Sequence, residues 1–302
     1  MRISLIISVT LALLGVQACA VNAPAAANSK PVSAPTNAVA DSPVANNAPS
    51  TATTDGTLHP TLFLVGDSIM KTGTPPGDRG PWGMGYELAP MFDPAKIHVY
   101  NEGAGGRSSR GFIEEGLWGK TLAQIQRGDF VILMFGHNDA ANSTNYPDRI
   151  TLKGNDDETQ EINSPVTGNK ETIHSYGWYL RQYAADVKAK GATLIICSPV
   201  PRNSWSGGKI VRGFDGYAGW AAEAAKQAGV LFIDLNTLAA NHYDALGQQT
   251  TASYFADNQH TTKAGAKVNA GSVVEGLKQL KDCPLANDLA PVPPATTATS
   301  AP

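Results

Sequence analysis

Serine, histidine and aspartate, the residue types of a hydrolytic triad, stand in two short blocks near opposite ends of the chain. Ser68 ends the run Gly66-Asp67-Ser68, directly after an apolar stretch, and Asp257 precedes His260 by three residues. A serine at such a turn can lie where backbone N–H groups point outward, which suits a nucleophile. A carboxylate three residues before an imidazole can orient it toward a serine. Each block alone is weak evidence, because both are also ordinary turn or helix-cap sequences.

Two further blocks could supply N–H groups to a negative charge that develops on a substrate oxygen. One is the glycine-rich run 101–110, where the backbone of Gly106 could approach a substrate closely and present its N–H. The other is Gly-His-Asn-Asp at 136–139, in which the side-chain amide of Asn138 could donate with little reorganisation. A plain flexible loop is the alternative interpretation of the first block, so neither block identifies an oxyanion hole by itself.

The sequence also contains candidates for contacts with a sugar. Arg107 and Arg110 could bind an anionic sugar such as a uronic acid, and an arginine in solvent is the equal alternative. His137 could line a pocket or merely support its loop. Trp82 and Trp205 stand in segments rich in glycine or proline, where a buried role is harder to arrange. We therefore expect these two tryptophans to stack on sugar faces.

These residues need elements that bring distant parts of the chain together, and the hydropathy pattern indicates them. Short apolar runs typical of buried strands occur at Thr61–Val65, Ile97–Asn101, Phe130–Phe135, Thr193–Cys197 and Leu231–Asp234. Helix-length stretches lie at Leu117–Gln126, Thr172–Lys190, Tyr217–Ala228 and Lys263–Leu280. Strands that alternate with helices predict an α/β domain whose parallel sheet is covered by helices on both faces. Functional residues of such sheets gather at the carboxyl ends of the strands.

The four blocks together are more specific than any one of them. GDS, GGRSSR, GHND and DNQH occur in this order, and each stands at or just beyond a strand end or before the last helix. The chain resembles the SGNH (GDSL-type) hydrolases, and within them the rhamnogalacturonan acetylesterase-like carbohydrate esterases. Further matches are Tyr-Gly-Trp-Tyr-Leu at 176–180, Ser-Pro-Val-Pro-Arg-Asn at 198–203 and Thr-Thr-x-x-Gly-Ala after His260. The resemblance implies a three-layer α/β/α sandwich with a five-stranded parallel sheet, the flavodoxin-like SGNH hydrolase fold.

Carried over residue by residue, the resemblance implies that Ser68 is the nucleophile and that His260 is the general base and later the acid. Asp257 would fix the imidazole tautomer. The oxyanion hole would consist of the backbone N–H groups of Ser68 and Gly106 and the side chain of Asn138. The reaction would remove acetyl groups from acetylated rhamnogalacturonan or pectin through an acyl-enzyme. No cofactor is implied, and the sequence has no HExxH or CxxC pattern to indicate a metal site.

Two alternatives remain open at the level of the sequence. The first is an esterase of the same fold that acts on acetylxylan, another sugar ester or a small ester. The second belongs to another class, a cell-surface glycan-binding lipoprotein with an idle site, and the intact set of catalytic residue types disfavours it. The expected partner is an acetylated polysaccharide, and we expect a monomer.

The N-terminal segment predicts export. Arg2 precedes an apolar stretch at 3–16, which is too short to span a membrane and is typical of a signal peptide over 1–19. The sequence up to Cys19 resembles a lipoprotein box, in which that cysteine would be lipidated, whereas 18–20 also fits ordinary cleavage. The expected location is the outer membrane or cell surface as a lipoprotein, or the periplasm or medium as a secreted protein.

Two segments have compositions that cannot form a core. Residues 20–55 and 284–302 consist mainly of Ala, Pro, Asn, Ser, Thr and Val without aromatic residues, which predicts a disordered tether and a disordered tail. The remaining 56–283 form the expected SGNH hydrolase catalytic domain. Cys197 and Cys283 could pair within it, although a buried thiol is the commoner state.

The charge balance excludes one large class of function. The 302 residues contain 23 Lys and Arg against 26 Asp and Glu, a net charge of −3, whereas nucleic-acid binders usually carry a basic stripe. We therefore expect no nucleic-acid partner. Beyond the N-terminus no apolar run reaches the roughly 20 residues of a spanning helix, so any membrane attachment would depend on the N-terminal lipid.

Overall fold

The computed structural model describes residues 59–71, 80–140, 147–164 and 168–291. The expected signal peptide with Cys19 and the expected tether 20–55 lie outside the described residues. In the part of the chain that is described, no helix is long and apolar enough to cross a membrane.

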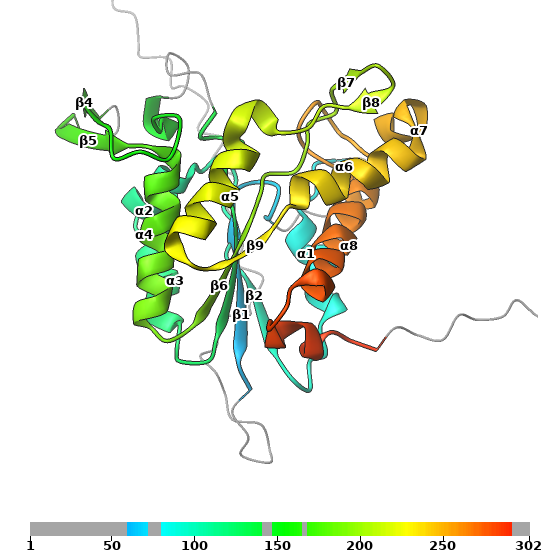
Figure 1. The fold of residues 1–302 in the computed structure, drawn as a ribbon, viewed down its shortest axis with the longest axis horizontal. Coiled ribbons are helices and arrows are strands. Elements are labelled where there is room, and N and C mark those ends of the chain that lie inside the picture. Colours follow the sequence, from blue (N-terminus) through cyan, green and yellow to red (C-terminus); the bar gives the residue numbers. More distant parts are fainter. Residues whose placement is uncertain (1–58, 72–79, 141–146, 165–167, 292–302) are drawn as a thin grey trace, which may run out of the picture. The chain divides into compact units, whose positions relative to one another are not determined.

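A five-stranded parallel sheet forms the centre of the fold, as the sequence predicts (Figure 1). Its strands, in spatial order, are β2 (His98–Asn101), β1 (Thr61–Gly66), β3 (Phe130–Met134), β6 (Thr193–Cys197) and β9 (Leu231–Ile233). Each pair of neighbours is parallel, with Thr61 opposite His98 and Leu62 opposite Phe130. The central strands β1 and β3 are buried along their whole length, which explains their continuous apolar sequences.

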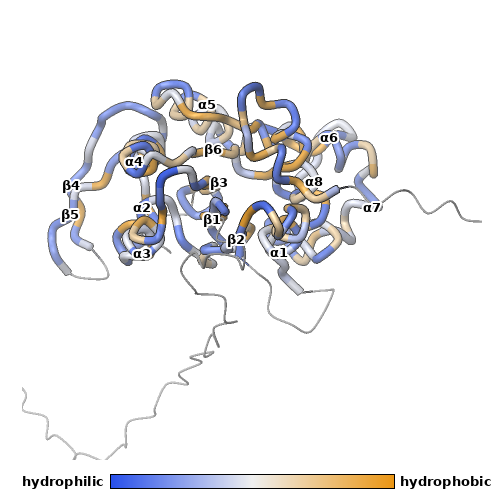
Figure 2. The backbone as a smooth tube through the Cα atoms, turned by 90° about the horizontal axis from the view of Figure 1, so that it is seen from below, coloured by the Kyte–Doolittle hydropathy of each residue, from blue (hydrophilic) through white to orange (hydrophobic). Residues whose placement is uncertain are grey.

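Helices cover both faces of the sheet, so the three-layer α/β/α architecture is confirmed. Leu62 and Leu64 of β1 point to one face and Phe63 and Val65 to the other, as the two-residue period of a strand requires. The first face packs against α1 (Met84–Leu88), α6 (Leu235–Leu246) and α8 (Lys263–Gln279). The second packs against α2 (Ser109–Glu114), α3 (Leu117–Gln124), α4 (Tyr176–Ala189) and α5 (Tyr217–Ala228). Figure 2 shows these two groups of helices on opposite sides of the strands.

The remaining elements are short. They are helix α7 (Gln248–Ala252), hairpin β4 (Thr159–Asn163) with β5 (Lys170–His174), hairpin β7 (Trp205–Ser206) with β8 (Lys209–Ile210), and 3-10 helices at Ala89–Met91, Pro147–Arg149, Phe214–Gly216 and Pro284–Asp288.

The start of α4 differs from the expected helix Thr172–Lys190. Residues 170–174 form β5 and pair with β4, and the side chain of Ser175 then accepts a hydrogen bond from the backbone N–H of Trp178. Such a serine cap begins a helix, so α4 starts at Tyr176. Residues 170–174 have Ile173 as their one apolar side chain and belong to a mostly exposed hairpin, which hydropathy alone did not separate from the helix that follows.

The C-terminal boundary expected for the catalytic domain, residue 283, is wrong. Residues 284–288 form a 3-10 helix in which Leu285 is completely buried. Leu289 pairs with Phe92 in an isolated β-bridge, and the backbone N–H of Ala290 donates to the carbonyl of Met91. The packed structure therefore continues to 291, and the part of the expected tail beyond that lies outside the described residues. Cys197 and Cys283 are both buried free thiols.

Candidate active site

Ser68 lies on the tight turn at the carboxyl end of β1. The carbonyl of Asp67 accepts hydrogen bonds from the N–H groups of Met70 and Lys71, and its carboxylate accepts one from Ile69 over 2.9 Å. A Cβ atom at Gly66 would lie only 2.6 Å from the carbonyl oxygen of Met134 on the neighbouring strand. Glycine is therefore required where β1 ends, and the turn holds Ser68 half-buried at the rim of a pocket.

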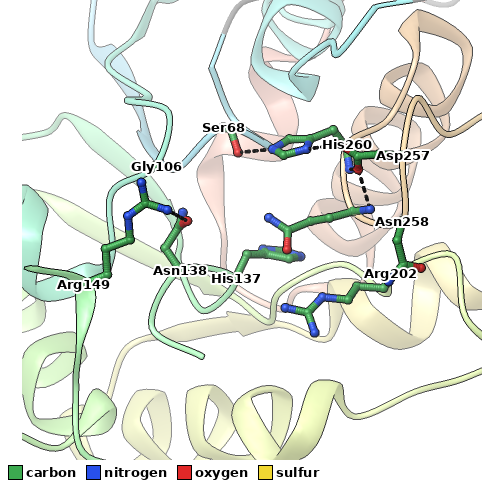
Figure 3. A pocket seen from close by; sticks show the side chains of 10 residues that line it. Ser68, Gly106, His137, Asn138, Arg149, Arg202, Asp257, Asn258 and His260 are labelled. Carbon is green, nitrogen blue, oxygen red and sulfur yellow. Dashed lines mark hydrogen bonds and ion pairs between the residues drawn. The ribbon is translucent and has the colours of Figure 1, made fainter. Parts of the chain in front are cut away.

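Ser68, His260 and Asp257 form a continuous hydrogen-bonded chain (Figure 3). Ser68 Oγ lies 2.9 Å from His260 Nε2, and His260 Nδ1 lies 2.7 Å from Asp257 Oδ2. Since a carboxylate only accepts, Nδ1 carries the proton and Nε2 can accept the proton of the serine hydroxyl. The residues come from opposite ends of the chain, 192 positions apart for the serine and histidine. This geometry is that of a serine with an oriented general base.

The carboxylate of Asp257 is fixed by its own loop. Its Oδ1 accepts the backbone N–H groups of Gln259 over 2.7 Å and His260 over 2.6 Å. Burial raises the pKa of Asp257, but the N–H groups of His260 and Gln259 and the imidazole lower it by more, so the net pKa lies below the ordinary value. Asp257 is therefore ionised at neutral pH, and the 53% exposure of its side chain to water also favours the charged form.

The loop that carries His260 is tied to two other loops of the site. The backbone N–H of Trp82 donates to the carbonyl of Thr261, and the hydroxyl of Thr261 donates to the carbonyl of Trp82. On the other side, the N–H of Asn203 donates to the carbonyl of Asn258 over 2.9 Å. These hydrogen bonds hold the loop of His260 in place, and with it the position of the imidazole beside Ser68.

The residues expected to supply the oxyanion donors line the same pocket as Ser68. Gly106 has a φ of +80°, a left-handed conformation that favours glycine, and it lines the pocket together with Asn138. Asn138 Nδ2 donates to the carbonyl of Arg107 over 3.1 Å, and Arg149 Nη1 donates to Asn138 Oδ1 over 3.2 Å. An amide nitrogen has two N–H groups, so the second is available for a substrate oxygen.

Arg149 was not identified from the sequence. It lies in the short 3-10 helix Pro147–Arg149, within the long polar stretch between β3 and α4. Its guanidinium has donors only, which fixes Oδ1 of Asn138 toward Arg149 and the amide nitrogen away from it. Only its place in the insertion after the Gly-His-Asn-Asp block could have hinted at this contact.

His137 is buried beside Asp67 and lines the pocket. Its Nε2 lies 3.0 Å from the carbonyl of Val200 and must donate to it. Its Nδ1 lies 3.4 Å from Asp67 Oδ2, and both of these buried atoms have no other hydrogen-bond partner among the described residues. His137 therefore both lines the pocket and supports its loop through the contact with Val200.

Asp139 joins the second and third blocks behind the pocket. Its carboxylate accepts from the hydroxyl of Ser109 over 2.5 Å and from the backbone N–H of Ser109, while its carbonyl accepts from the hydroxyl of Tyr217. Complete burial raises the pKa of Asp139 to about 7, and the hydrogen bonds from Ser109 offset this only in part. This carboxyl group holds the glycine-rich loop against the loop of Asn138.

The arginines expected to bind a sugar lie outside the pocket lining. Arg107 forms a bidentate ion pair with Glu115 and donates to the carbonyl of Gly105. Arg110 is neither a sugar ligand nor in solvent: its side chain is 1% exposed and pairs with Glu114, four residues along α2. The acidic partners in and after α2 take up both charges, which corrects these two expectations.

The expected stacking tryptophans are likewise used elsewhere. Trp205 lies in β7, packs partly buried against the core and donates to Asn203 Oδ1. Trp82 donates to Glu87 and packs edge-on against Tyr86. Neither lines the pocket, because hairpin β7–β8 and helix α1 give both indoles protein partners.

The pocket beside Ser68 and His260 has a volume of about 530 Å³. Its lining consists of Ser68, Gly106, His137, Asn138, Arg149, Arg202, Asp257, Asn258, Gln259 and His260. Among the described residues, no three His, Cys, Asp or Glu side chains are grouped as a metal site would require. A serine with an oriented base, in a pocket that Gly106 and Asn138 also line, can perform acyl transfer.

Comparison with known proteins gives consistent matches. Residues 64–268 match the model of the GDSL-like lipase/acylhydrolase family. The chain is 32% identical to a rhamnogalacturonan acetylesterase from Emericella nidulans, over 73% of this chain and 85% of that protein. It is 31% identical to a probable rhamnogalacturonan acetylesterase, YesY, from Bacillus subtilis, over 72% and 93%. The crystal structure of protein YxiM from Bacillus subtilis superposes with a TM-score of 0.60 at 25% identity, covering 74% of this chain and 57% of that one.

Proposed function

The chain belongs to the GDSL-like lipase/acylhydrolase family, and from that premise we propose that it is an exported esterase that removes acetyl groups from acetylated rhamnogalacturonan. Esterase activity follows from the family and from relatives that are themselves named acetylesterases. The polymer is supported by the names of the two relatives above, both more than 30% identical.

The observation that carries the proposal is the chain of two hydrogen bonds at the pocket. Ser68 Oγ is 2.9 Å from His260 Nε2 and His260 Nδ1 is 2.7 Å from Asp257. In the proposed reaction Oγ attacks the carbonyl carbon of the acetyl ester while Nε2 takes the hydroxyl proton. The tetrahedral intermediate collapses, the sugar oxygen leaves with the proton from His260, and the acetyl group stays on Ser68.

Water completes the cycle by the same route. His260 takes a proton from a water molecule, whose oxygen attacks the acetyl carbon, and the proton returns to Ser68 Oγ as acetate leaves. The negative oxygen of both tetrahedral intermediates would be bound by the N–H groups of Ser68 and Gly106 and by the free amide hydrogen of Asn138. Asp257 stays ionised throughout, because the N–H groups of its loop keep its pKa low.

Acetate release tests the proposal and its polymer. Wild-type protein and Ser68→Ala are supplied with acetylated rhamnogalacturonan, acetylxylan and a chromogenic acetate. We expect release from all substrates that fit the pocket, the highest kcat/KM on rhamnogalacturonan, and none by Ser68→Ala. Equal activity on all three would leave the esterase but remove the pectic substrate. Activity on none, with folded protein, would favour the glycan-binding alternative.

Export and lipid attachment are part of the proposal and rest on the sequence of 1–19. Expression of the full chain in a bacterial host with labelled palmitate should label the wild-type protein but not Cys19→Ser. Membrane-free, unlabelled wild-type protein in the medium or periplasm would instead indicate ordinary secretion. We propose that the mature protein acts as a monomer, which size-exclusion chromatography with light scattering can check.

A further inference from the structure

Two guanidinium groups line the active-site pocket, and they differ in their partners. Arg149 is hydrogen-bonded to Asn138 and so belongs to the oxyanion side. Arg202 also lines the pocket, but none of the ion pairs or side-chain hydrogen bonds of the described residues involves its guanidinium. Figure 3 shows Arg202 on the side of the pocket opposite Ser68.

An aromatic ring holds the guanidinium of Arg202 in place. Its Cζ lies 4.4 Å from the centroid of the Phe214 ring, and the same ring packs edge-on against His137 at 4.6 Å. Stacking on an aromatic face orders a guanidinium while leaving its N–H edge open to a ligand. Arg202 is therefore positioned before any substrate arrives, and its N–H groups have no acceptor among the residues that the structure describes.

The turn that presents Phe214 has an unusual backbone. Gly213, Phe214, Asp215 and Gly216 have φ values of 83°, 47°, 54° and 99°. Non-glycine residues in this left-handed region cost free energy, and such strain is retained where the surroundings fix it, often at ligand sites. The N–H of Gly213 donates to Asn236 Oδ1, and Asn236 Nδ2 donates to the carbonyl of Pro199. The turn is thereby fastened to the loop that carries Arg202.

The charge of the pocket favours an anion at this position. Its lining has two arginines and one carboxylate, that of Asp257, which already accepts the imidazole and two backbone N–H groups. Of the charged groups in the lining, only the guanidinium of Arg202 has neither a hydrogen-bond nor an ion-pair partner among the described residues. A guanidinium fork matches a carboxylate with two parallel hydrogen bonds.

We propose that Arg202, stacked on Phe214, binds the carboxylate of a uronic acid residue of the substrate and so selects acidic over neutral acetylated polysaccharides. The inference rests on the proposed esterase function and adds to it a specificity-determining residue. It also moves the anion-binding role expected for Arg107 and Arg110 to an arginine on the loop after β6. Asn203, next to Arg202, is hydrogen-bonded to Asn258 in the histidine loop, so the bound carboxylate would help place the ester beside Ser68.

Competition by simple sugars tests this role. The probes are D-galacturonate and D-galactose, which differ only in the carboxylate, and each competes with a chromogenic acetate. We expect galacturonate to inhibit the wild-type protein roughly 10- to 100-fold more strongly than galactose, as a charge-assisted hydrogen-bonded pair predicts. D-Glucuronate is a third probe. Inhibition by D-glucuronate equal to that by D-galacturonate would show recognition of the carboxylate alone, whereas weaker inhibition would show that the ring configuration of galacturonate is recognised as well.

Three variants make the result specific. Arg202→Gln should be inhibited equally by galacturonate and galactose. Arg202→Lys should retain part of the preference for galacturonate, because lysine keeps the charge but lacks the planar pair of N–H donors. Arg212→Gln, in which an arginine paired with Asp244 outside the pocket is changed, should behave as wild type. Thermal unfolding of each variant confirms that it is folded.

Two results would overturn the inference: no preference for galacturonate in the wild type, or a preference that persists in Arg202→Gln. Failure of the proposed function is a separate outcome. If acetylated rhamnogalacturonan is not hydrolysed but the preference for galacturonate depends on Arg202, the polymer is wrong and the anion site stands. If the chromogenic acetate is not hydrolysed either, calorimetric titration with the same sugars gives the same comparison without turnover.

Discussion

Arg149 Nη1 donates a hydrogen bond to Asn138 Oδ1 over 3.2 Å, and this contact determines which way the Asn138 amide faces. With the oxygen directed to Arg149 and one N–H to the carbonyl of Arg107, the second N–H is the group left to bind a substrate oxygen. An oxyanion donor is effective when it is oriented before the reaction begins. Two residues from different loops therefore act together on one donor.

Removal of the Asn138 amide should slow the chemical step. We expect Asn138→Ala to lower kcat by roughly 10²–10³-fold, about 3–4 kcal/mol, because the donor is needed most in the transition state. Initial rates on a chromogenic acetate measure this, with Asn241→Ala, an exposed asparagine away from the pocket, as the control. A loss below tenfold in a folded Asn138→Ala protein would contradict the assignment.

Arg149 should matter only through Asn138. We expect Arg149→Ala to lower kcat by roughly tenfold, since the amide can then rotate, and to have little further effect in an Asn138→Ala background. Residues that share one interaction give non-additive effects of this kind in a double-mutant cycle. The four kcat values of the cycle are the measurement, and full additivity would show that Arg149 acts independently of the amide.

Asp139 should make stability depend on pH. Burial raises its pKa from 3.8 to about 7, so the folded state prefers the protonated form and binds the proton more tightly than the unfolded state. The resulting stabilisation is complete below about pH 4 and is lost as the pH rises through 7, in total on the order of a few kcal/mol. Asp139→Asn lacks this contribution.

Urea unfolding at several pH values between 4 and 8 measures the effect. The free energy of unfolding of the wild type minus that of Asp139→Asn should fall as the pH rises. Taking this difference removes the contribution of the other carboxylates, which both proteins share. A difference that stays constant or grows with pH would exclude a raised pKa of Asp139.

Gly136 should tolerate no side chain. Its φ is +136°, and a Cβ there would lie 3.0 Å from Pro199 Cγ, so we expect Gly136→Ala to lower the free energy of unfolding by roughly 1–3 kcal/mol. Activity should also fall, because His137 and Asn138 follow directly. Gly119→Ala is the matched control: in α3 nothing lies within 4 Å of its Cβ, and it should raise stability by up to about 1 kcal/mol. Equal effects of the two substitutions would show that neither the backbone conformation of Gly136 nor its contact with Pro199 excludes a side chain.

The parts of the fold that were predicted from the sequence depend on local pattern. Strands such as Phe130–Met134 are buried on both faces, so their continuous apolar sequence identifies them without knowledge of their neighbours. The helix Tyr217–Ala228 was predicted with its observed bounds, since Gly229 ends it in a left-handed conformation. The blocks with Ser68 and His260 could be recognised because each is contiguous.

The parts that were missed depend on contacts between distant segments. Leu285 is the apolar residue that ties 284–288 to the core, but its neighbours have the composition of a disordered tail. The contacts of the arginines could not be predicted, because residue type alone does not reveal that Glu115 pairs with Arg107 or that Phe214 stacks on Arg202. Such pairings appear only when the chain has folded.

Labelling by a fluorophosphonate tests whether Ser68 is the activated nucleophile of an esterase. Such a reagent transfers its phosphonyl group to an activated serine oxygen, fluoride leaves, and the adduct is not hydrolysed. We expect one adduct per protein, located on Ser68 by mass spectrometry of the digested protein. The adduct should form in step with the loss of activity on a chromogenic acetate and should be absent from Ser68→Ala. An adduct on another residue that accompanies the loss of activity, or wild-type turnover by Ser68→Ala, would contradict this role of Ser68.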